Sequence, residues 1–306
     1  MEWIIIIALL LCVCAAAWFA ARALMKSFAD ISKHREFLVS RGAPKKADGT
    51  REKEEPGDSF LEPESVRIPS AYGYDLACEM YVCEDSEKGV VLCHAAGSSK
   101  EELRAYAQIF LERGITVLAY DQRGHGGSGD DPCGFGFFET PDARACVDYL
   151  ENTLGETARI GIWGTGMGAA VAAGLIKQDD RIEFAVLDTV YADLASILEV
   201  WLKNRCRGFY CKPMLHVLDF VNRYEYKWSI FDVARLRGMA KTKGPLLLIQ
   251  GAADTLVPAE NAYRFALERK DARLVIFPKA AHGCCRASNP AEYRRVVQKF
   301  LIRADF

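Results

Sequence analysis

The sequence has little net charge, few histidines and no long run of like charge. Its 39 basic and 41 acidic side chains nearly cancel, which leaves a formal charge of -2 over 306 residues. Because binding to phosphates needs a basic face, this balance argues against nucleic acid as a partner. The five histidines are dispersed, and none stands at metal-ligand spacing from another. We therefore expect no metal ion and no other cofactor.

Cysteine is abundant, but the spacing of a disulfide scaffold is missing. Of eleven cysteines, Cys12 and Cys14 lie in an apolar N-terminal segment, and the rest are scattered and odd in number. No second pair matches Cys206 and Cys211, so a zinc knuckle is not predicted. We interpret the cysteines as free buried thiols of a protein in a reducing compartment.

Charge is absent from residues 3–21, which are mostly Ile, Leu, Ala and Cys. At a rise of about 1.5 Å per residue, such a helix just spans a bilayer core of about 30 Å. A cleaved signal peptide would carry positive charge before the apolar run, and only Glu2 stands there. We therefore predict a transmembrane anchor over residues 1–24 that meets the lipid bilayer through residues 3–21.

The residues after the predicted anchor are rich in charge. Arginines and lysines follow the apolar run and none precedes it, so the positive-inside rule predicts a single-pass protein of the cell membrane whose main domain is cytoplasmic. Residues 43–57 read APKKADGTREKEEPG and have no apolar period. Residues 25–63 are therefore predicted to be a charged, solvated linker.

Short apolar runs alternate with helical patterns from residue 64 to the C-terminus. An opening antiparallel pair is predicted around a turn at residues 71–73, and the later strands are separated by helices, which indicates a mostly parallel sheet with right-handed crossovers. Residues 191–243 break this rhythm with a long, aromatic-rich helical insertion, predicted as a cap over the carboxyl ends of the strands. The eight predicted strands are residues 66–69, 74–82, 89–94, 115–120, 159–163, 183–188, 245–250 and 273–277.

A glycine-rich turn follows the fifth predicted strand. Residues 161–168 read GIWGTGMG, with a helix expected to open at Met167. In this context the nucleophile elbow G-x-S-x-G has its serine at the apex of a sharp strand-to-helix turn. Gly164 and Gly168 match the small flanking residues of that pattern, but the apex position is occupied by Gly166. The position of the nucleophile is therefore vacant.

The partners of such a nucleophile are present in the expected chain order. Asp254 stands just after one predicted strand and His282 follows the last one. An aspartate in this arrangement holds the tautomer of the imidazole, which in turn activates a hydroxyl. Backbone amides of Ala96 and Met167 are predicted to form an oxyanion hole. The residues Asp121 and His125, after the fourth strand, are interpreted as structural supports of their loop.

The motifs HAAG, DQRGHGGSG, GTGMG, GAADTLVP and AAHG, in this order, resemble an α/β-hydrolase. The opening IPSAYGYDL after an apolar segment resembles the bacterial membrane-anchored, serine aminopeptidase-like hydrolases. The resemblance covers residue 64 to the C-terminus and implies the α/β-hydrolase fold, with cleavage of esters, amides, thioesters or peptides in ordinary members. Two departures are Gly166 for the usual serine and Ala95 for the glycine of the usual His-Gly pair.

These departures predict a protein that is impaired or inactive as a serine hydrolase. Some proteins of this fold, such as the N-myc downstream-regulated proteins, lack a working nucleophile and act as binding or scaffold proteins. By this resemblance the chain is expected to bind an apolar, acyl or peptidyl small molecule, or a protein partner. Serine and glycine codons differ by one base, so resequencing the gene would test whether the glycine is natural.

Two alternatives remain open at this stage. In one, the chain is an active hydrolase that uses water activated by His282, or one of the side chains Thr165, Cys93, Cys284 and Cys285, as its nucleophile. In the other, the spacing Gly164-x-Gly166-x-x-Ala169, with Asp188 about 20 residues on, is a dinucleotide-binding fingerprint. The second leaves Asp254 and His282 without a role.

Overall fold

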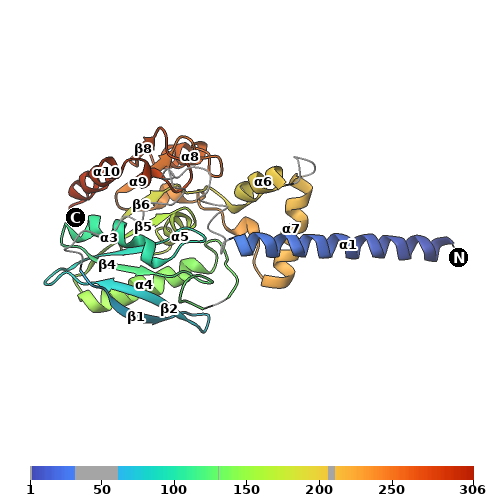
Figure 1. The fold of residues 1–306 in the computed structure, drawn as a ribbon, viewed down its shortest axis with the longest axis horizontal. Helices are drawn as coiled ribbons and strands as arrows, with labels where there is room; N and C mark the ends of the chain where they lie inside the picture. The colour runs from blue at the N-terminus through green and yellow to red at the C-terminus, as the bar shows by residue number, and fades with distance from the viewer. Residues whose placement is uncertain (1, 32–60, 130, 206–210) are drawn as a thin grey trace, which may run out of the picture.

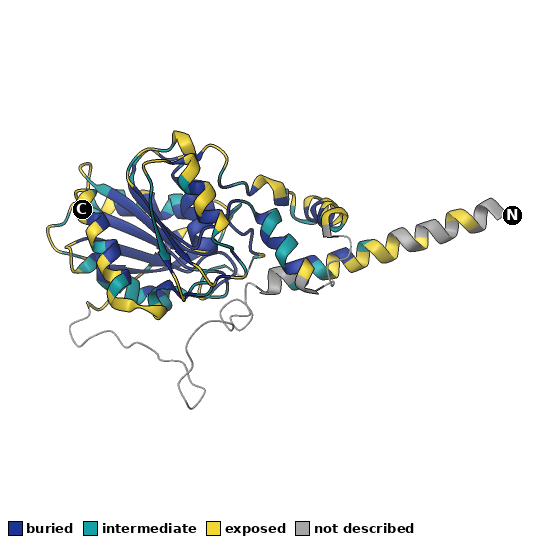
Figure 2. Ribbon diagram, turned by 90° about the horizontal axis from the view of Figure 1, so that it is seen from above, coloured by how far each residue is buried: buried dark blue, intermediate teal, exposed yellow. Residues whose placement is uncertain are grey.

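The described residues of the computed structural model are 2–31, 61–129, 131–205 and 211–306, and they form one eight-stranded sheet flanked by helices (Figure 1). The strand order is β1-β2-β4-β3-β5-β6-β7-β8. The prediction of a mostly parallel eight-stranded sheet is confirmed. Helices cover both faces, so the strands lie in the interior, as their burial in Figure 2 shows.

The first strands of the sheet are antiparallel and the others are parallel. β1 pairs with β2 and β2 with β4 in antiparallel register, while all pairs from β4 to β8 are parallel. The central strands are nearly all buried residues, because helices cover both of their faces. The strands are β1 Glu64–Pro69, β2 Asp75–Tyr81, β3 Lys88–Cys93, β4 Thr116–Tyr120, β5 Arg159–Thr165, β6 Ile182–Asp188, β7 Leu246–Gly251 and β8 Arg273–Phe277.

Two apolar cores lie on opposite faces of the sheet. One core joins the sheet to α4 (Glu139–Leu154), α5 (Met167–Leu175) and α8 (Glu260–Glu268). The other joins it to α3 (Arg104–Leu111) and α10 (Pro290–Arg303), with the short α9 (Cys285–Ser288) beside them. This arrangement leaves the carboxyl ends of the parallel strands uncovered by the two helix layers.

The helical segment that follows β3 begins with a 3-10 turn. η1 (Lys100–Leu103) precedes α3, and the backbone N–H of Lys100 donates to the carboxylate of Asp121 at 2.8 Å. The Lys100 ammonium also reaches that carboxylate, at 2.8 Å. This double attachment pulls the start of the segment onto the neighbouring loop, which explains the tighter first turn.

The described residues between β6 and β7 form two helices and two short 3-10 turns. They are α6 (Leu194–Arg205), α7 (Cys211–Tyr226), η2 (Ile230–Asp232) and η3 (Met239–Lys241). The buried side chains of α6, α7 and η2 form a third apolar cluster, which also includes Met167 at the start of α5, whereas Met239 of η3 packs in the core that contains α5 and α8. The cap therefore covers the region where β5 meets α5.

The N-terminal helix α1 (Glu2–Ile31) extends away from the rest of the molecule and packs its C-terminal half against α7 (Figure 1). Ala21 and Met25 are buried in the same cluster as the cap side chains. Within the part of the chain that is described, no helix is both long and apolar enough to cross a membrane. The helix runs past the predicted anchor boundary at residue 24, and residues 32–60 of the predicted linker lie outside the described ranges.

Candidate active site

The turn between β5 and α5 has the backbone of a strained elbow. Gly166 at its apex has φ 56° and ψ -115°, a conformation that a residue with a side chain adopts only at a cost. A Cβ on Gly164 would collide with the carbonyl oxygen of Gly168, and a Cβ on Gly168 would collide with that of Cys93. The two flanking glycines are therefore required by close packing of backbone on backbone.

The space at the apex is open, in contrast to the space at the flanking glycines. A Cβ built on Gly166 would lie 3.4 Å from the Cβ of Ala95 and 3.7 Å from Nε2 of His282. Both are ordinary van der Waals distances. A hydroxyl one bond further out would therefore come within hydrogen-bond reach of the imidazole.

His282 and Asp254 are joined by a hydrogen bond. Nδ1 of His282 lies 2.8 Å from Oδ2 of Asp254. The other carboxylate oxygen accepts the backbone N–H groups of Leu256 and Val257 at 2.9 and 2.8 Å, so the carboxylate has a fixed orientation. Because an ionised carboxylate only accepts, the proton of the neutral imidazole lies on Nδ1, and Nε2 is left as an acceptor facing Gly166.

The two amides predicted for an oxyanion hole, those of Ala96 and Met167, belong to residues that both line the pocket beside His282. Met167 is the first residue of α5, and the first amides of a helix have no partner within the helix. The positive end of the α5 dipole also points at the apex of the turn. This corner is thus suited to an anionic oxygen.

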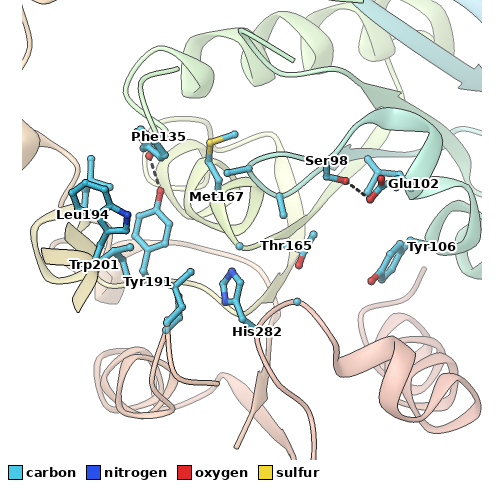
Figure 3. Close-up of a pocket in the computed structure, with 18 residues that line it drawn as sticks. Ser98, Glu102, Tyr106, Phe135, Thr165, Met167, Tyr191, Leu194, Trp201 and His282 are labelled. Atoms are coloured by element: carbon cyan, nitrogen blue, oxygen red, sulfur yellow. Dashed lines mark hydrogen bonds between the residues drawn. The ribbon is translucent and has the colours of Figure 1, made fainter. Parts of the chain in front are cut away.

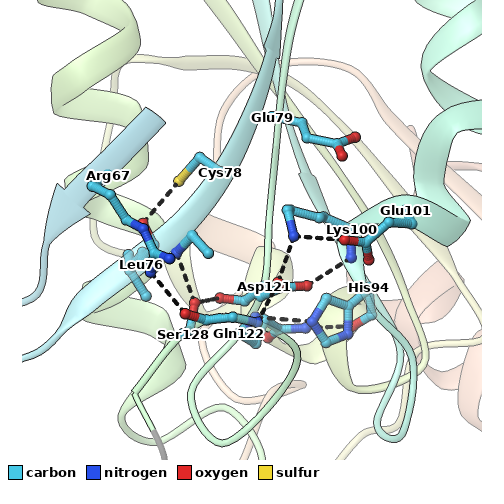
Figure 4. A network of polar contacts seen from close by, with 12 residues as sticks. Arg67, Leu76, Cys78, Glu79, His94, Lys100, Glu101, Asp121, Gln122 and Ser128 are labelled. Carbon is cyan, nitrogen blue, oxygen red and sulfur yellow. Dashed lines mark hydrogen bonds and ion pairs between the residues drawn. The ribbon is translucent and has the colours of Figure 1, made fainter. Parts of the chain in front are cut away.

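The loop that carries Ala96 is attached to the loop after β4 by buried polar contacts (Figure 4). Asp121 accepts from the backbone N–H of Lys100 and of Gly127, each at 2.8 Å. Nε2 of His125 accepts the backbone N–H of Gly97 at 3.0 Å. These contacts agree with the interpretation of Asp121 and His125 as supports of their loop.

His94 is a further support that the sequence did not single out. Its Nε2 accepts the backbone N–H of Gln122 at 2.8 Å, and its Nδ1 lies 2.7 Å from the carbonyl oxygen of Ala95. Complete burial, together with the nearby ring of His125, lowers the pKa of His94 from 6.5 to about 3. The imidazole is therefore neutral and donates from Nδ1.

A pocket of about 140 Å³ lies beside Gly166 and His282, and Figure 3 shows that its two ends differ in polarity. On one side of the imidazole, the walls are apolar and aromatic and come largely from the cap. On the other side, Ser98 donates to Glu102 at 2.9 Å, and Tyr106 and Thr165 lie nearby. The apolar end includes Phe135, Tyr191, Leu194, Ile197, Trp201, Leu256 and Val257.

Most of these pocket residues were missed by sequence reasoning. Ser98, Glu102 and Tyr106 follow β3 at the carboxyl edge of the sheet, where ligands bind in open α/β sheets. Their position just after a strand end could have identified them as candidate ligand-binding residues. No comparable signal marks Phe135, which comes from the loop before α4 and whose carbonyl oxygen accepts the hydroxyl of Tyr191 at 2.7 Å.

The thiols near the site are poorly placed to replace a serine. Burial raises the pKa of Cys93 to about 12, and burial followed by the neighbouring Asp188 carboxylate raises that of Cys285 strongly. Cys284 is buried and its thiol donates to the backbone oxygen of His282 at 3.3 Å, away from Nε2. A thiol with a raised pKa holds little of the nucleophilic thiolate.

Thr165 and Asp188 were named in the alternative interpretations. The hydroxyl oxygen of Thr165 is buried without a hydrogen-bond partner among the described residues, so no base activates it. Asp188 is buried at the end of β6, where its carboxylate accepts the hydroxyl of Thr189 at 2.9 Å, and burial raises its pKa to about 6. It does not line the pocket, so the geometry gives no support to a ribose-binding acid.

A mostly parallel sheet with a strand-to-helix elbow, an acid after β7 and a histidine after β8 defines a protein of the α/β-hydrolase fold. The family model described as the alpha/beta hydrolase family matches residues 90–296 of this chain. The chain belongs to the alpha/beta hydrolase family.

Comparisons with individual proteins agree with this family assignment. The chain is 30% identical over 248 residues to the uncharacterized protein YqkD of Bacillus subtilis, covering 79% of this chain and 80% of that protein. The structure of the esterase Pf2001 of Pyrococcus furiosus superposes with a TM-score of 0.67 at 26% identity, covering 86% of this chain and 99% of the esterase. A hydrolase of Pseudomonas aeruginosa shares the fold, with a TM-score of 0.59 at 24% identity over 78% of this chain and 98% of that structure.

Proposed function

We propose that this member of the alpha/beta hydrolase family is impaired or inactive as a serine hydrolase and binds a small molecule in the pocket beside His282. The observation that carries the proposal is the apex of the elbow, where Gly166 offers no hydroxyl although His282 and Asp254 stand ready to activate one. Removal of a triad serine lowers the rate by several orders of magnitude. The oxyanion hole alone still gives a slow reaction, faster than that in water.

The ligand we propose is an acyl or peptidyl molecule with an apolar portion. The aromatic and aliphatic end of the pocket suits a hydrocarbon or apolar side chain, whose burial contributes about 25 cal/mol per Å². The amides of Ala96 and Met167 suit a carbonyl oxygen. The polar end, with the Ser98 and Glu102 side chains, suits a group that forms hydrogen bonds.

We also propose that α1 anchors the chain in the cell membrane through residues 3–21, with the main domain on the cytoplasmic side. Support comes from the uncharged sequence of that segment and from the basic residues that follow it. The same feature supports the resemblance to bacterial membrane-anchored, serine aminopeptidase-like hydrolases. The esterase name of the Pyrococcus furiosus relative is compatible with an acyl ligand.

A fluorophosphonate probe, which forms a covalent bond only with an activated nucleophile, tests the loss of hydrolase activity. We expect no labelling of the native chain. Gly166→Ser should be labelled, because its hydroxyl would face Nε2 of His282 across a distance that the backbone already allows. The readout is in-gel fluorescence followed by mass spectrometry of the labelled peptide.

Two further variants make this test specific. Gly166→Ala carries the same backbone cost without a hydroxyl and should remain unlabelled, and His282→Gln added to Gly166→Ser should abolish the gained labelling. Labelling of the native chain at any residue would support the alternative, an active hydrolase with a non-standard nucleophile. Failure of Gly166→Ser to react would show that the site has lost more than its serine.

A further inference from the structure

The cap helix α7 has an apolar face that is exposed to solvent. Val217, Phe220 and Tyr224 follow one another at helical spacing and are 40%, 64% and 63% exposed. Two other residues of the helix, Leu218 and Val221, are buried in the cap core. A helix with one face in a core normally has a polar outer face, so this exposed set requires an explanation.

The exposed face of α7 is continuous with the surface of α1. Trp18 contacts Phe220 and Tyr224 edge-on, with ring centroids 6.0 and 5.1 Å apart. Phe19, the next residue of α1, is 64% exposed. Trp18 and Phe19 belong to the uncharged residues 3–21, through which α1 continues toward the N-terminus. We call Phe19, Val217, Phe220 and Tyr224 the junction face.

The charges around the junction face are predominantly basic. Lys212, Arg223 and Lys227, on and just after α7, are all exposed. The two acidic residues of α7 are engaged with other groups. Asp219 is buried and accepts the hydroxyl of Ser229 at 2.7 Å, and Glu225 forms an ion pair with Arg22 at 3.0 Å. The outer surface of α7 thus combines exposed aromatic rings with uncompensated positive charge.

We infer that the junction face lies in the headgroup region of a bilayer containing anionic lipid. Aromatic side chains favour this region, exposed lysines and arginines attract anionic headgroups, and an amphipathic helix with both features lies in the plane of the interface. This inference rests on the proposed anchoring through α1. It adds a second contact, because an anchor alone would leave α7 free to point into water.

The location of the junction face relates the membrane to the ligand pocket. α7 packs against α6, and α6 supplies Leu194, Ile197 and Trp201 to the apolar end of the pocket. The pocket wall is therefore separated from the proposed lipid surface by a single layer of helices. Such an arrangement favours an apolar ligand that is taken from the membrane.

Quenching of tryptophan fluorescence by spin-labelled lipid tests this inference. Full-length Phe220→Trp would be reconstituted in lipid nanodiscs that hold one chain each, made of phosphatidylcholine and phosphatidylglycerol with a doxyl label near the headgroup. Leu267→Trp is the matched control, because Leu267 lies on α8 and is also an exposed apolar helical residue, 74% exposed. The emission of the native chain is subtracted from both variants.

We expect the added emission of Phe220→Trp to be quenched about twofold and that of Leu267→Trp to remain unchanged, since only the former would sit at headgroup level. Equal quenching of the two would overturn the inference. Flotation of the native chain with vesicles separates this result from failure of the anchor. A chain that does not float refutes the anchor, and one that floats without selective quenching refutes only the docking of α7.

Charge reversal provides an independent second measurement. Lys212→Glu/Arg223→Glu should remove the increase in quenching that phosphatidylglycerol causes, whereas Lys270→Glu/Lys299→Glu, at exposed positions away from α7, should not. Quenching that is insensitive to phosphatidylglycerol in the native chain would contradict the assigned role of these charges. Crosslinked dimers through α7, with no quenching in single-copy discs, would assign the face to a second copy and overturn the inference.

Discussion

At the scale of single residues, the elbow combines an unusual backbone conformation with a hydrogen-bonded acid and histidine. Gly166 has the backbone angles of a strained apex, and Asp254 and His282 form a hydrogen bond with each other beside it. Glycine removes most of the strain, since it lacks the Cβ that makes positive φ unfavourable. The methyl group of the neighbouring Ala95 would lie 3.4 Å from a Cβ at this position, so any side chain there would contact it.

The burial of His94 predicts that its contribution to the free energy of unfolding decreases in mild acid. Its pKa is about 3 in the folded chain and 6.5 in the unfolded chain, so between these values the unfolded state binds the additional proton. This contribution to stability is complete above pH 6.5 and is lost as the pH falls toward 3. Between pH 7 and pH 5 this contribution of His94 to the free energy of unfolding should fall by about 2 kcal/mol.

The measurement is the free energy of unfolding of the full chain, in mild detergent, at several pH values, compared with His94→Gln. Asp188 contributes with the opposite sign, since its pKa of about 6 lies above the ordinary 3.8, and its effect is common to both proteins. The difference between the two curves should therefore shrink as the pH falls from 7 to 5. A constant difference would mean that the pKa of His94 is the same in the folded and unfolded states.

At the scale of elements, the packing of the β5–α5 turn predicts that replacing Gly168 costs more stability than replacing Gly166. A Cβ on Gly168 would collide with backbone carbonyl groups of Cys93 and His94, whereas one on Gly166 would meet only ordinary contacts. Gly168→Ala should therefore destabilise the fold by at least about 3 kcal/mol, and Gly166→Ala by about 1–2 kcal/mol from backbone strain alone. Thermal unfolding monitored by circular dichroism checks the order, and an equal loss for both would refute it.

The strands and helices were predictable from the sequence because their signals are local. Short apolar runs identified β3 to β8, and their alternation with helical patterns indicated the parallel sheet. The vacant apex, Asp254 and His282 were also predictable, since each lies at a fixed place relative to a strand end. Their roles in binding or catalysis stay predictions.

The pocket walls were not predictable in the same way. Phe135 comes from the loop before α4, whereas Tyr191 and Trp201 come from the cap insertion, and the two parts meet only through the packing of the cap. Nothing in the local pattern distinguishes them from ordinary core aromatics. The packing of α1 on α7 was also missed, because an uncharged N-terminal segment gives no sign of what its last turns will contact.

At the scale of the whole molecule, one apolar cluster connects the N-terminal helix with the site. It runs from Ala21 and Met25 on α1 through the cap to Met167 at the elbow. Protein interiors are close-packed, so a loss of volume at one end of such a cluster is felt by the side chains it supports. The N-terminal helix is in this sense a part of the cap.

The last prediction follows from this continuity. Met25 is 5% exposed, and Met25→Ala should remove enough buried volume to destabilise the cap by about 2 kcal/mol. The stability of the sheet should be unaffected, since Met25 belongs to neither of the two apolar cores that cover its faces. Hydrogen exchange should therefore quicken in α6 and α7, while β3 to β8 keep their protection.

The control is the neighbouring exposed position, Lys26→Ala, which should leave exchange unchanged throughout. An environment-sensitive apolar probe that binds at Trp201 and Leu194 should lose affinity several-fold in Met25→Ala, because the pocket wall on α6 rests on the same cluster. If exchange quickens only in α1, the helix is merely attached to the cap. If the cap loosens and the probe binds as before, the pocket is shaped by the sheet and its loops rather than by α6.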